Sequence, residues 1–204
     1  MQNLAAALSE RKQQQLYRTR QTLDGPQDVV VHIDGHEYLS FCSNDYLGLA
    51  NHPSLIKALK QGAERFGVGS GAAHLISGHS YAHQALEEEL AEFVGRPRAL
   101  LFSTGYMANL GVLSALTGRG DSVFEDRLNH ASLIDAARLS GARLVRYAHK
   151  DIASLHRKMA RTGGGGRLIA SDGVFSMDGD CAPLVDLAAL AAAADAWLLV
   201  DDAH

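Results

Sequence analysis

The stretch Trp197-Leu198-Leu199-Val200-Asp201-Asp202-Ala203-His204 governs how the rest of the chain is interpreted. Its apolar first half predicts a buried β-strand, and its second half puts ionisable side chains at the carboxyl end of that strand. In α/β sheets, ligands bind beyond the carboxyl ends of the strands. A carboxylate and an imidazole three residues apart, Asp201 and His204, therefore indicate the edge of an active site and suggest a polarised cofactor.

The sequence upstream of this strand repeats one rhythm, in which short apolar runs alternate with segments of helical periodicity. This alternation predicts an α/β fold with a mostly parallel sheet covered by helices. A flexible joint is expected at Gly163–Gly166. The predicted strands are 99–102, 122–124, 142–147, 168–171 and 197–201, and the predicted helices are 106–117, 131–140, 151–160 and 184–194.

The first half of the chain has a different pattern. Residues 1–20 predict a polar helix, and residues 28–40 alternate apolar and polar side chains around Asp34-Gly35, which is a hairpin signal. Pro53 favours a helix start, and Leu86, Leu90 and Phe93 mark a further helix.

Composition excludes several classes of protein. The 204 residues carry a net charge of −4 with no Lys/Arg-rich run, so we expect no nucleic-acid or anionic-membrane partner. The longest apolar run, Leu187–Ala194, is too short to span a bilayer, and the N-terminus lacks a signal-peptide pattern. Cys42 and Cys181 are interpreted as ordinary thiols, which predicts a cytoplasmic location.

A Gly-rich stretch, Gly67-Val68-Gly69-Ser70-Gly71-Ala72, matches the residue pattern G-x-G-x-x-A of the dinucleotide fingerprint but not its structural context. That fingerprint follows a strand and opens a helix, whereas here a helix precedes and a loop follows. We reject the nucleotide interpretation. A turn that lets backbone approach a ligand or partner subunit and a loop with unusual dihedral angles both stay open.

Three polar loops follow predicted strands, and each has an alternative structural explanation. Ser103–Asn109 opens a helix, where free N–H groups favour a phosphate or a side chain simply caps the helix. His130 lies at a strand end, where it stacks on a ligand or serves only the structure. Ser176 lies in a turn-rich loop and contacts a cofactor or only solvent. Because the carboxyl ends of parallel strands share one edge, these loops and Asp201/His204 together predict one site.

Other kinds of site have no positive signal. His79 and His83 are four residues apart, but without an H-E-x-x-H motif or a nearby third ligand we expect no metal. No G-x-S-x-G or Walker motif supports a hydrolase or an NTPase.

The combined motifs resemble those of the α-oxoamine synthases, which are fold-type I pyridoxal-phosphate (PLP) enzymes. The resemblance covers essentially the whole chain. It implies an N-terminal helix and hairpin over residues 1–42 and a cofactor-binding large domain over residues 43–204, truncated at its C-terminal side. The motifs are Ser43–Leu49, Gly69–Gly71, Ile76–Gly78, Ser103–Gly105, Asn129–Ser132, Val174–Asp180 and Asp201–His204.

The resemblance also implies roles for particular residues. Asp201 would pair with the pyridine nitrogen, where a carboxylate keeps the nitrogen protonated so that the ring accepts the electrons of a carbanion. The other implied roles are the cofactor phosphate for Gly105 and Tyr106, the phenolic oxygen for Ser176 and His204, stacking and substrate contact for the catalytic His130, and the substrate for Arg18 and Asn44.

The implied reaction is a decarboxylative condensation on PLP. Gly69–Ser80 and the short N-terminal arm are most similar to the member that joins L-alanine to pimeloyl-CoA or a pimeloyl-carrier protein. The resemblance to the family as a whole implies a homodimer. Other members use glycine or serine. The family's Schiff-base lysine lies downstream of His204, so we expect this chain to be about half of an enzyme and inactive alone; the alternative is a lysine-less, non-catalytic partner subunit. Lys12, Lys57, Lys60, Lys150 and Lys158 match no Schiff-base position.

Overall fold

A computed structural model describes residues 3–204, and its contacts divide the chain into two compact units, residues 1–72 and 73–204. The functional division expected at residue 42 remains a prediction.

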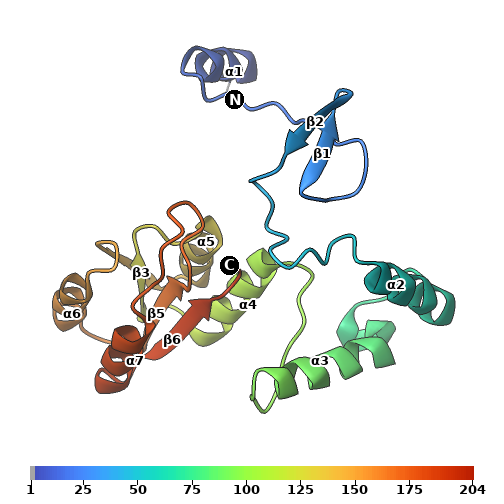
Figure 1. Ribbon diagram of the computed structural model, residues 1–204. Coiled ribbons are helices and arrows are strands. Elements are labelled where there is room, and N and C mark those ends of the chain that lie inside the picture. The colour runs from blue at the N-terminus through green and yellow to red at the C-terminus, as the bar shows by residue number, and fades with distance from the viewer. Residues whose placement is uncertain (1–2) are drawn as a thin grey trace. The chain divides into compact units, whose positions relative to one another are not determined.

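The first unit contains a helix, a hairpin and a second helix (Figure 1). Helix α1 (Leu4–Gln13) ends before the predicted end at residue 20, because Gln15 has a φ of 57° and cannot continue a right-handed helix. Residues 1–2 of the predicted helix lie outside the described residues. The expected hairpin is present: β1 (Val30–Ile33) pairs antiparallel with β2 (His36–Leu39). Positive φ values of 52° at Asp34 and 76° at Gly35 fit the two-residue turn of such hairpins.

Helix α2 (Pro53–Phe66) begins at the predicted proline, with His52 as its cap. In the second unit, a short π-helical turn, η1 (His74–Gly78), leads into α3 (Tyr81–Phe93).

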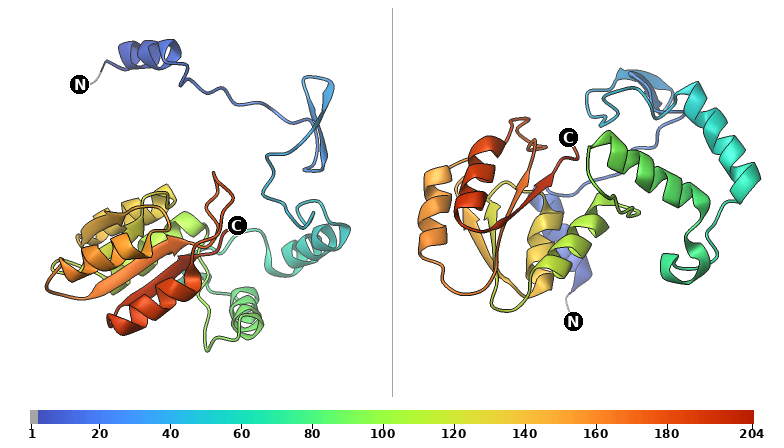
Figure 2. Two further views of the ribbon diagram at one scale, coloured as in Figure 1. Left: turned by 60° about the vertical axis from the view of Figure 1, so that its left-hand side comes forward. Right: turned by 90° about the horizontal axis from the view of Figure 1, so that it is seen from below.

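A parallel sheet with the strand order β4-β3-β5-β6 forms the centre of the second unit, and it confirms the predicted α/β class (Figures 1 and 2). Most of the predicted segments are right to within a residue or two at each end. The elements after α3 are α4 (Gly105–Leu116), β3 (Ser122–Asp126), α5 (Ala131–Ser140), β4 (Arg143–Tyr147), α6 (Ile152–Ala160), β5 (Arg167–Asp172), α7 (Leu184–Ala193) and β6 (Trp197–Asp201).

Helices cover both faces of this sheet because the buried strands alternate their side chains. On one face, Phe124 and Ile169 pack with side chains of α6 and α7. On the other face, Val123 and Leu168 pack with side chains of α4 and α5. The result is a three-layer core whose central strands β3 and β5 are buried on both faces.

One predicted strand does not form, and another forms as predicted but is not buried as expected. Residues 99–102 form no strand: the Leu101 amide donates to the Glu87 side chain at 3.0 Å instead of to a neighbouring strand, and Leu100 is exposed. A strand requires a paired neighbour, which this segment lacks among the described residues. The strand before Asp201 is also not buried, because β6 lies at the edge of the described sheet and Trp197 is 65% exposed.

The Gly163–Gly166 segment, which was expected to be a flexible joint, is held at Gly166 by a hydrogen bond. The Asp121 carboxylate accepts the Gly166 amide at 2.6 Å and the Gly118 amide at 2.9 Å. This carboxylate therefore ties the loop before β5 to the connection before β3. Among the described residues, no helix is long and apolar enough to cross a membrane.

Candidate functional site

A cavity of about 120 Å³ lies at the carboxyl edge of β5 and β6, beside the N-termini of α4 and α5. It collects residues from four separate parts of the second unit. The side chains and backbone that line it belong to Gly105, Tyr106, His130, Ser132, Asp172, Val174, Ser176, Asp201, Ala203 and His204.

Asp201 ends β6, and its carboxylate is held in place by a buried amide. The side-chain Nδ2 of Asn109, on α4, donates to Asp201 Oδ2 at 2.7 Å and to Ser132 Oγ at 2.9 Å. The Ala203 amide donates to Asp201 Oδ1 at 3.2 Å. Asn109 is only 7% exposed, so a buried donor fixes the orientation of a carboxylate that lines the cavity.

His130 is the N-cap of α5, and its position is fixed by its own helix and by β5. Its Nδ1 lies 2.7 Å from Ser132 Oγ, and its backbone N–H donates to both carboxylate oxygens of Asp172, at 3.3 and 3.1 Å. Burial raises the pKa of Asp172 above its ordinary value, the His130 N–H opposes that rise, and the nearby Asp201 charge adds to it. The Tyr106 ring meets the His130 ring edge-on, with 6.5 Å between centroids.

Ser176 lies in the loop between β5 and α7, and contacts of the neighbouring Phe175 fix this loop. Phe175 is 1% exposed and packs edge-on against His149, with 4.5 Å between ring centroids. His149 in turn bridges Asp126 and Asp180, each at 3.0 Å. Burial lowers the pKa of His149, but the hydrogen bonds to Asp180 and Asp126 outweigh it and the net pKa is raised. These contacts fix the loop in the position in which Ser176 lines the cavity.

Helix α4 presents its N-terminus to the same cavity. Thr104 caps it by accepting the Met107 amide at 3.1 Å, which leaves Gly105 and Tyr106 as the first helical residues. The first N–H groups of an α-helix have no partner within the helix and favour an anion. The Tyr106 hydroxyl is directed to Asp135, to which it donates a hydrogen bond.

The structure brings six of the expected site residues together within the second unit. Arg18 and Asn44 are exposed residues of the first unit, and their expected contact with the substrate stays a prediction. The six that line the cavity are Gly105, Tyr106, His130, Ser176, Asp201 and His204.

Sequence reasoning assigned no role to Asn109, Ser132 or Asp172. Asn109 had a usable signal, because it is an amide inside the otherwise apolar segment that forms α4. Asp172 had a weaker one, as a carboxylate directly after an apolar strand. The hydrogen bonds from Asn109 to Ser132 and Asp201, and from His130 to Asp172, join residues 23 to 92 positions apart and were not predictable from local spacing.

One expectation about metal ligands is wrong. His79 and His83 do have a third imidazole nearby, because the turn at η1 brings His74 next to them. The ring centroid of His74 lies 5.2 Å from that of His79 and 4.8 Å from that of His83.

The donors of the cavity suit a flat aromatic ligand with an anionic arm. A helix N-terminus would bind the anion, an imidazole borders the space, and the carboxylate held by Asn109 would pair with a protonated ring nitrogen. A parallel sheet with a ligand cavity at its carboxyl edge is general to α/β proteins, and the large domain of fold-type I PLP transferases is one protein class with this arrangement.

The comparisons with known proteins place the chain more narrowly. Residues 36–204 match the family "Aminotransferase class I and II", and the chain belongs to this family. It is 62% identical over 203 residues to the 8-amino-7-oxononanoate synthase of Cellvibrio japonicus, covering 100% of this chain and 51% of the relative. For the 8-amino-7-oxononanoate synthase of Methylococcus capsulatus, identity is 63% over 200 residues, covering 98% and 52%.

Solved structures show the same similarity. Sphingomonas wittichii serine palmitoyltransferase matches with a TM-score of 0.89 and 33% identity, covering 97% of this chain and 51% of that one. The 8-amino-7-oxononanoate synthase from Francisella tularensis matches with a TM-score of 0.64 and 35% identity, covering 78% and 43%. A serine palmitoyltransferase variant from S. paucimobilis with a bound PLP–myriocin aldimine gives a TM-score of 0.89 at 31% identity, covering 97% and 50%. The chain spans about half the length of the curated relatives it matches.

Proposed function

We propose that the protein carrying this chain is a PLP-dependent C-acyltransferase, an 8-amino-7-oxononanoate synthase. The reaction condenses L-alanine with a pimeloyl thioester and gives 8-amino-7-oxononanoate, CO₂ and the free thiol carrier, a step of biotin biosynthesis. The observation that carries the proposal is the cavity that gathers Asp201, His130, Ser176 and the α4 N-terminus at one sheet edge. The 62% identity to a named 8-amino-7-oxononanoate synthase selects this reaction among those of the fold.

The residues of the cavity fit PLP by the chemistry of their donors and acceptors. The amides of Gly105 and Tyr106 would hold the phosphate, and the hydroxyl of Ser176 and the imidazole of His204 would bond at the phenolic oxygen. His130 would border the ring and face the substrate. When bound, PLP supplies an electron sink for the carbanion at the amino-acid Cα.

Two residues of this chain would stabilise the protonated ring nitrogen, one directly and one by orienting the other. Asp201 stabilises a proton on the ring nitrogen, since an opposite charge in contact favours the charged form. Asn109 keeps that carboxylate in one orientation through its 2.7 Å hydrogen bond. Arg18 and Asn44 are proposed to contact the substrate. The Schiff-base lysine is proposed to come from outside these 204 residues.

We also propose that the intact protein is a homodimer in the cytoplasm. In support of association, α2 has no buried residue although its apolar side chains recur at helical spacing. Leu59 is 74% exposed and Leu55 is 50% exposed. Size-exclusion chromatography with light scattering would give the mass of a dimer; a monomer at micromolar concentration would refute this part.

The activity test uses the intact protein with added PLP. L-alanine, glycine and serine are compared with pimeloyl-CoA and with a pimeloyl-carrier protein, and product is measured by mass spectrometry. We expect 8-amino-7-oxononanoate from L-alanine only. Efficient use of glycine or serine in place of alanine would overturn the substrate assignment, and no condensation with any of them would overturn the activity.

A pair of variants tests the role of Asp201. Asp201→Asn removes the negative charge while keeping the shape, and we expect turnover to fall about a hundredfold. Asp202→Asn, at the exposed neighbouring carboxylate, is the matched control and should retain turnover. Equal losses in the two variants would contradict the role of Asp201.

A further inference from the structure

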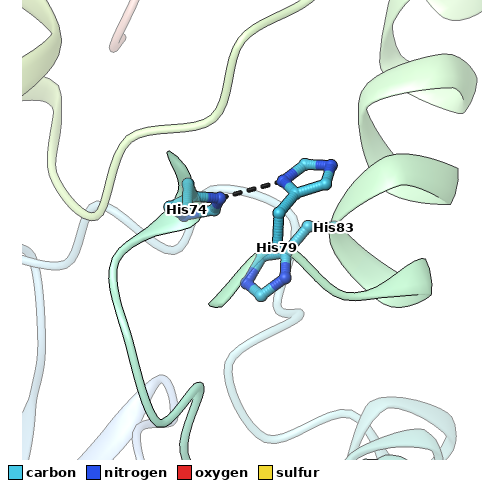
Figure 3. Close-up of side chains that lie close together, drawn as sticks. All are labelled: His74, His79 and His83. Atoms are coloured by element: carbon cyan, nitrogen blue, oxygen red, sulfur yellow. Dashed lines mark hydrogen bonds between the residues drawn. The ribbon is translucent and has the colours of Figure 1, made fainter. Parts of the chain in front are cut away.

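Three imidazoles converge within the second unit, away from the cavity residues. His74 begins η1, His79 follows that turn, and His83 lies in the first turn of α3 (Figure 3). Their nearest ligand nitrogens all lie within 4.8 Å of one another. Sequence spacing does not imply this arrangement, because the π-helical turn is what folds His74 back toward the helix start.

The closest pair of nitrogens is already arranged for sharing a cation. His74 Nδ1 and His79 Nδ1 are 2.9 Å apart. Two neutral imidazoles that meet nitrogen to nitrogen need one proton between them, and a metal ion can take the place of that proton. In a tetrahedral zinc site with Zn–N bonds of about 2.0–2.1 Å, ligand nitrogens are roughly 3.4 Å apart. Side-chain rotations that move each ligand nitrogen by a few tenths of an ångström up to about an ångström therefore give the nitrogen spacing of a tetrahedral zinc site.

The ring nitrogen of His79 that faces away from His74 has a partner that fixes the orientation of the ring. His79 Nε2 lies 3.3 Å from Gln84 Oε1, and Gln84 Nε2 donates to Glu88 Oε1 at 2.6 Å. This carboxylate–amide–imidazole chain puts the His79 proton on Nε2 and leaves Nδ1 with its lone pair toward His74. Acidic second partners of this kind also raise the basicity of a metal-bound imidazole.

His83 has two tautomers, and one suits an ion. Its Nδ1 accepts the Ser80 amide at 3.1 Å in one tautomer and can donate to Ser80 Oγ at 2.9 Å in the other. The second tautomer frees Nε2 as a ligand. The α3 N-terminus disfavours a cation, but only weakly at an exposed position. Direct bonds from three imidazoles to a divalent ion outweigh this unfavourable interaction, because coordination of a metal by protein ligands is much stronger than a helix-dipole effect.

We propose that His74, His79 and His83 form a binding site for a borderline divalent transition-metal ion, for which Zn²⁺ is the probe. Three imidazole ligands with no thiolate and no direct carboxylate favour Zn²⁺, Ni²⁺ or Cu²⁺ over Mg²⁺ and Ca²⁺. The remaining coordination position is open to water, because His74 and His79 are exposed. The ion would clamp η1 to the start of α3. The site is independent of the proposed PLP function.

The test is a Zn²⁺ titration of the intact, metal-free protein by isothermal calorimetry, with Mg²⁺ as the comparison ion. We expect Zn²⁺ to bind at one site per chain and Mg²⁺ not to bind. His79→Gln and His74→Gln should each weaken the Zn²⁺ affinity about tenfold or more. His156→Gln, at an exposed histidine of α6, is the matched control and should leave the affinity unchanged.

A second measurement does not depend on the variants folding. In ¹⁵N NMR of the histidine side chains, Zn²⁺ should shift the ring nitrogens of His74, His79 and His83 and leave those of His156 in place. Shifts confined to other histidines, or Zn²⁺ binding that survives both substitutions, would overturn the proposal. So would the absence of binding at millimolar Zn²⁺.

Discussion

At the scale of single residues, the site depends on buried polar side chains that fix the orientation of their neighbours. Asn109 holds the Asp201 carboxylate, and Asp172, which itself lines the cavity, accepts the backbone N–H of His130. Both act from the sheet or from a covering helix, where packing restricts side-chain motion. A ligand that enters the cavity therefore meets groups that are already oriented, which lowers the cost of binding.

Asn109 offers a test of this preorganisation, and the test depends on the proposed function. Asn109→Leu removes the hydrogen bond to the Asp201 carboxylate, and a bond to a charged group is worth about 1.5–3 kcal/mol. We expect PLP affinity in the intact protein to fall about tenfold or more, measured by fluorescence titration. Thr117→Val, which removes a buried hydrogen bond at the other end of α4, is the control for general destabilisation. If both variants weaken PLP binding equally, Asn109 has no positioning role.

Glu125 is a residue that the site does not explain. It is fully buried in β3, and neither carboxylate oxygen has a hydrogen-bond partner among the described residues. Burial raises its pKa to about 7, against the opposing charge of Arg146 and with added repulsion from Asp172. Because the folded-state pKa lies above the ordinary value of 4.5, the native state holds the proton more tightly. Its contribution to stability is full below the ordinary value and is lost as pH rises through about 7.

Glu125→Gln should therefore stabilise the protein at pH 8 and matter less at pH 5. The shift from 4.5 to about 7 sets an upper bound of roughly 3 kcal/mol on this gain. Urea unfolding at the two pH values measures it, with Glu89→Gln on the exposed face of α3 as the control. A gain of equal size at pH 5 and pH 8 would show that the buried charge is not its source.

At the scale of elements, the connections fix the sheet edge as firmly as the strands do. The loop before β5 passes so close to the loop before β3 that a Cβ on Gly165 would lie 2.0 Å from the Gly120 carbonyl oxygen. Its φ of +60° is also unfavourable for any side chain. The neighbouring Gly164 has a φ of +81° but open space around it.

This difference between two adjacent glycines predicts different stabilities for their alanine variants. Gly164→Ala has only the dihedral cost, about 1 kcal/mol, whereas Gly165→Ala has the steric clash with backbone in addition. We expect Gly165→Ala to be less stable than Gly164→Ala by roughly 1–3 kcal/mol in chemical unfolding. Equal stabilities would mean that the loop moves away from Gly120 at little cost.

At the scale of the whole molecule, the two units differ in how much they bury. In the described part of residues 1–72, Val31 is the buried hydrophobic residue, whereas residues 73–204 contain two apolar clusters on opposite faces of the sheet. Opening free energies follow burial and contact density, so stability should be unequal along the chain.

Hydrogen exchange of the 204-residue chain tests this inequality. We expect the slowest amides in β3 and β5, whose residues are buried on both faces, and the fastest in α1, which has no buried residue. Mass spectrometry of the exchanged peptides measures the order. Protection of α1 equal to that of β5 would contradict it.

The sequence by itself determined the alternation of strands and helices, the hairpin turn at Asp34-Gly35 and the cluster of polar strand ends. These features are local, because they depend on periodicity, turn chemistry and the shared edge of parallel strands. That is why His130, Ser176, Asp201 and His204 could be expected in one site. Gly105 and Tyr106 were expected there too, but they reach the cavity through the N-terminus of α4 and not through a strand at 99–102.

Only the tertiary structure decided which partners hold those residues and which apparent elements form. The missing strand at 99–102 and the exposed edge strand β6 depend on neighbours that periodicity does not record. The Asn109–Asp201 hydrogen bond joins residues 92 positions apart, and the His74–His79–His83 cluster depends on one π-helical turn. Hydrogen bonds and steric contacts act across space, so residue spacing along the chain cannot specify them.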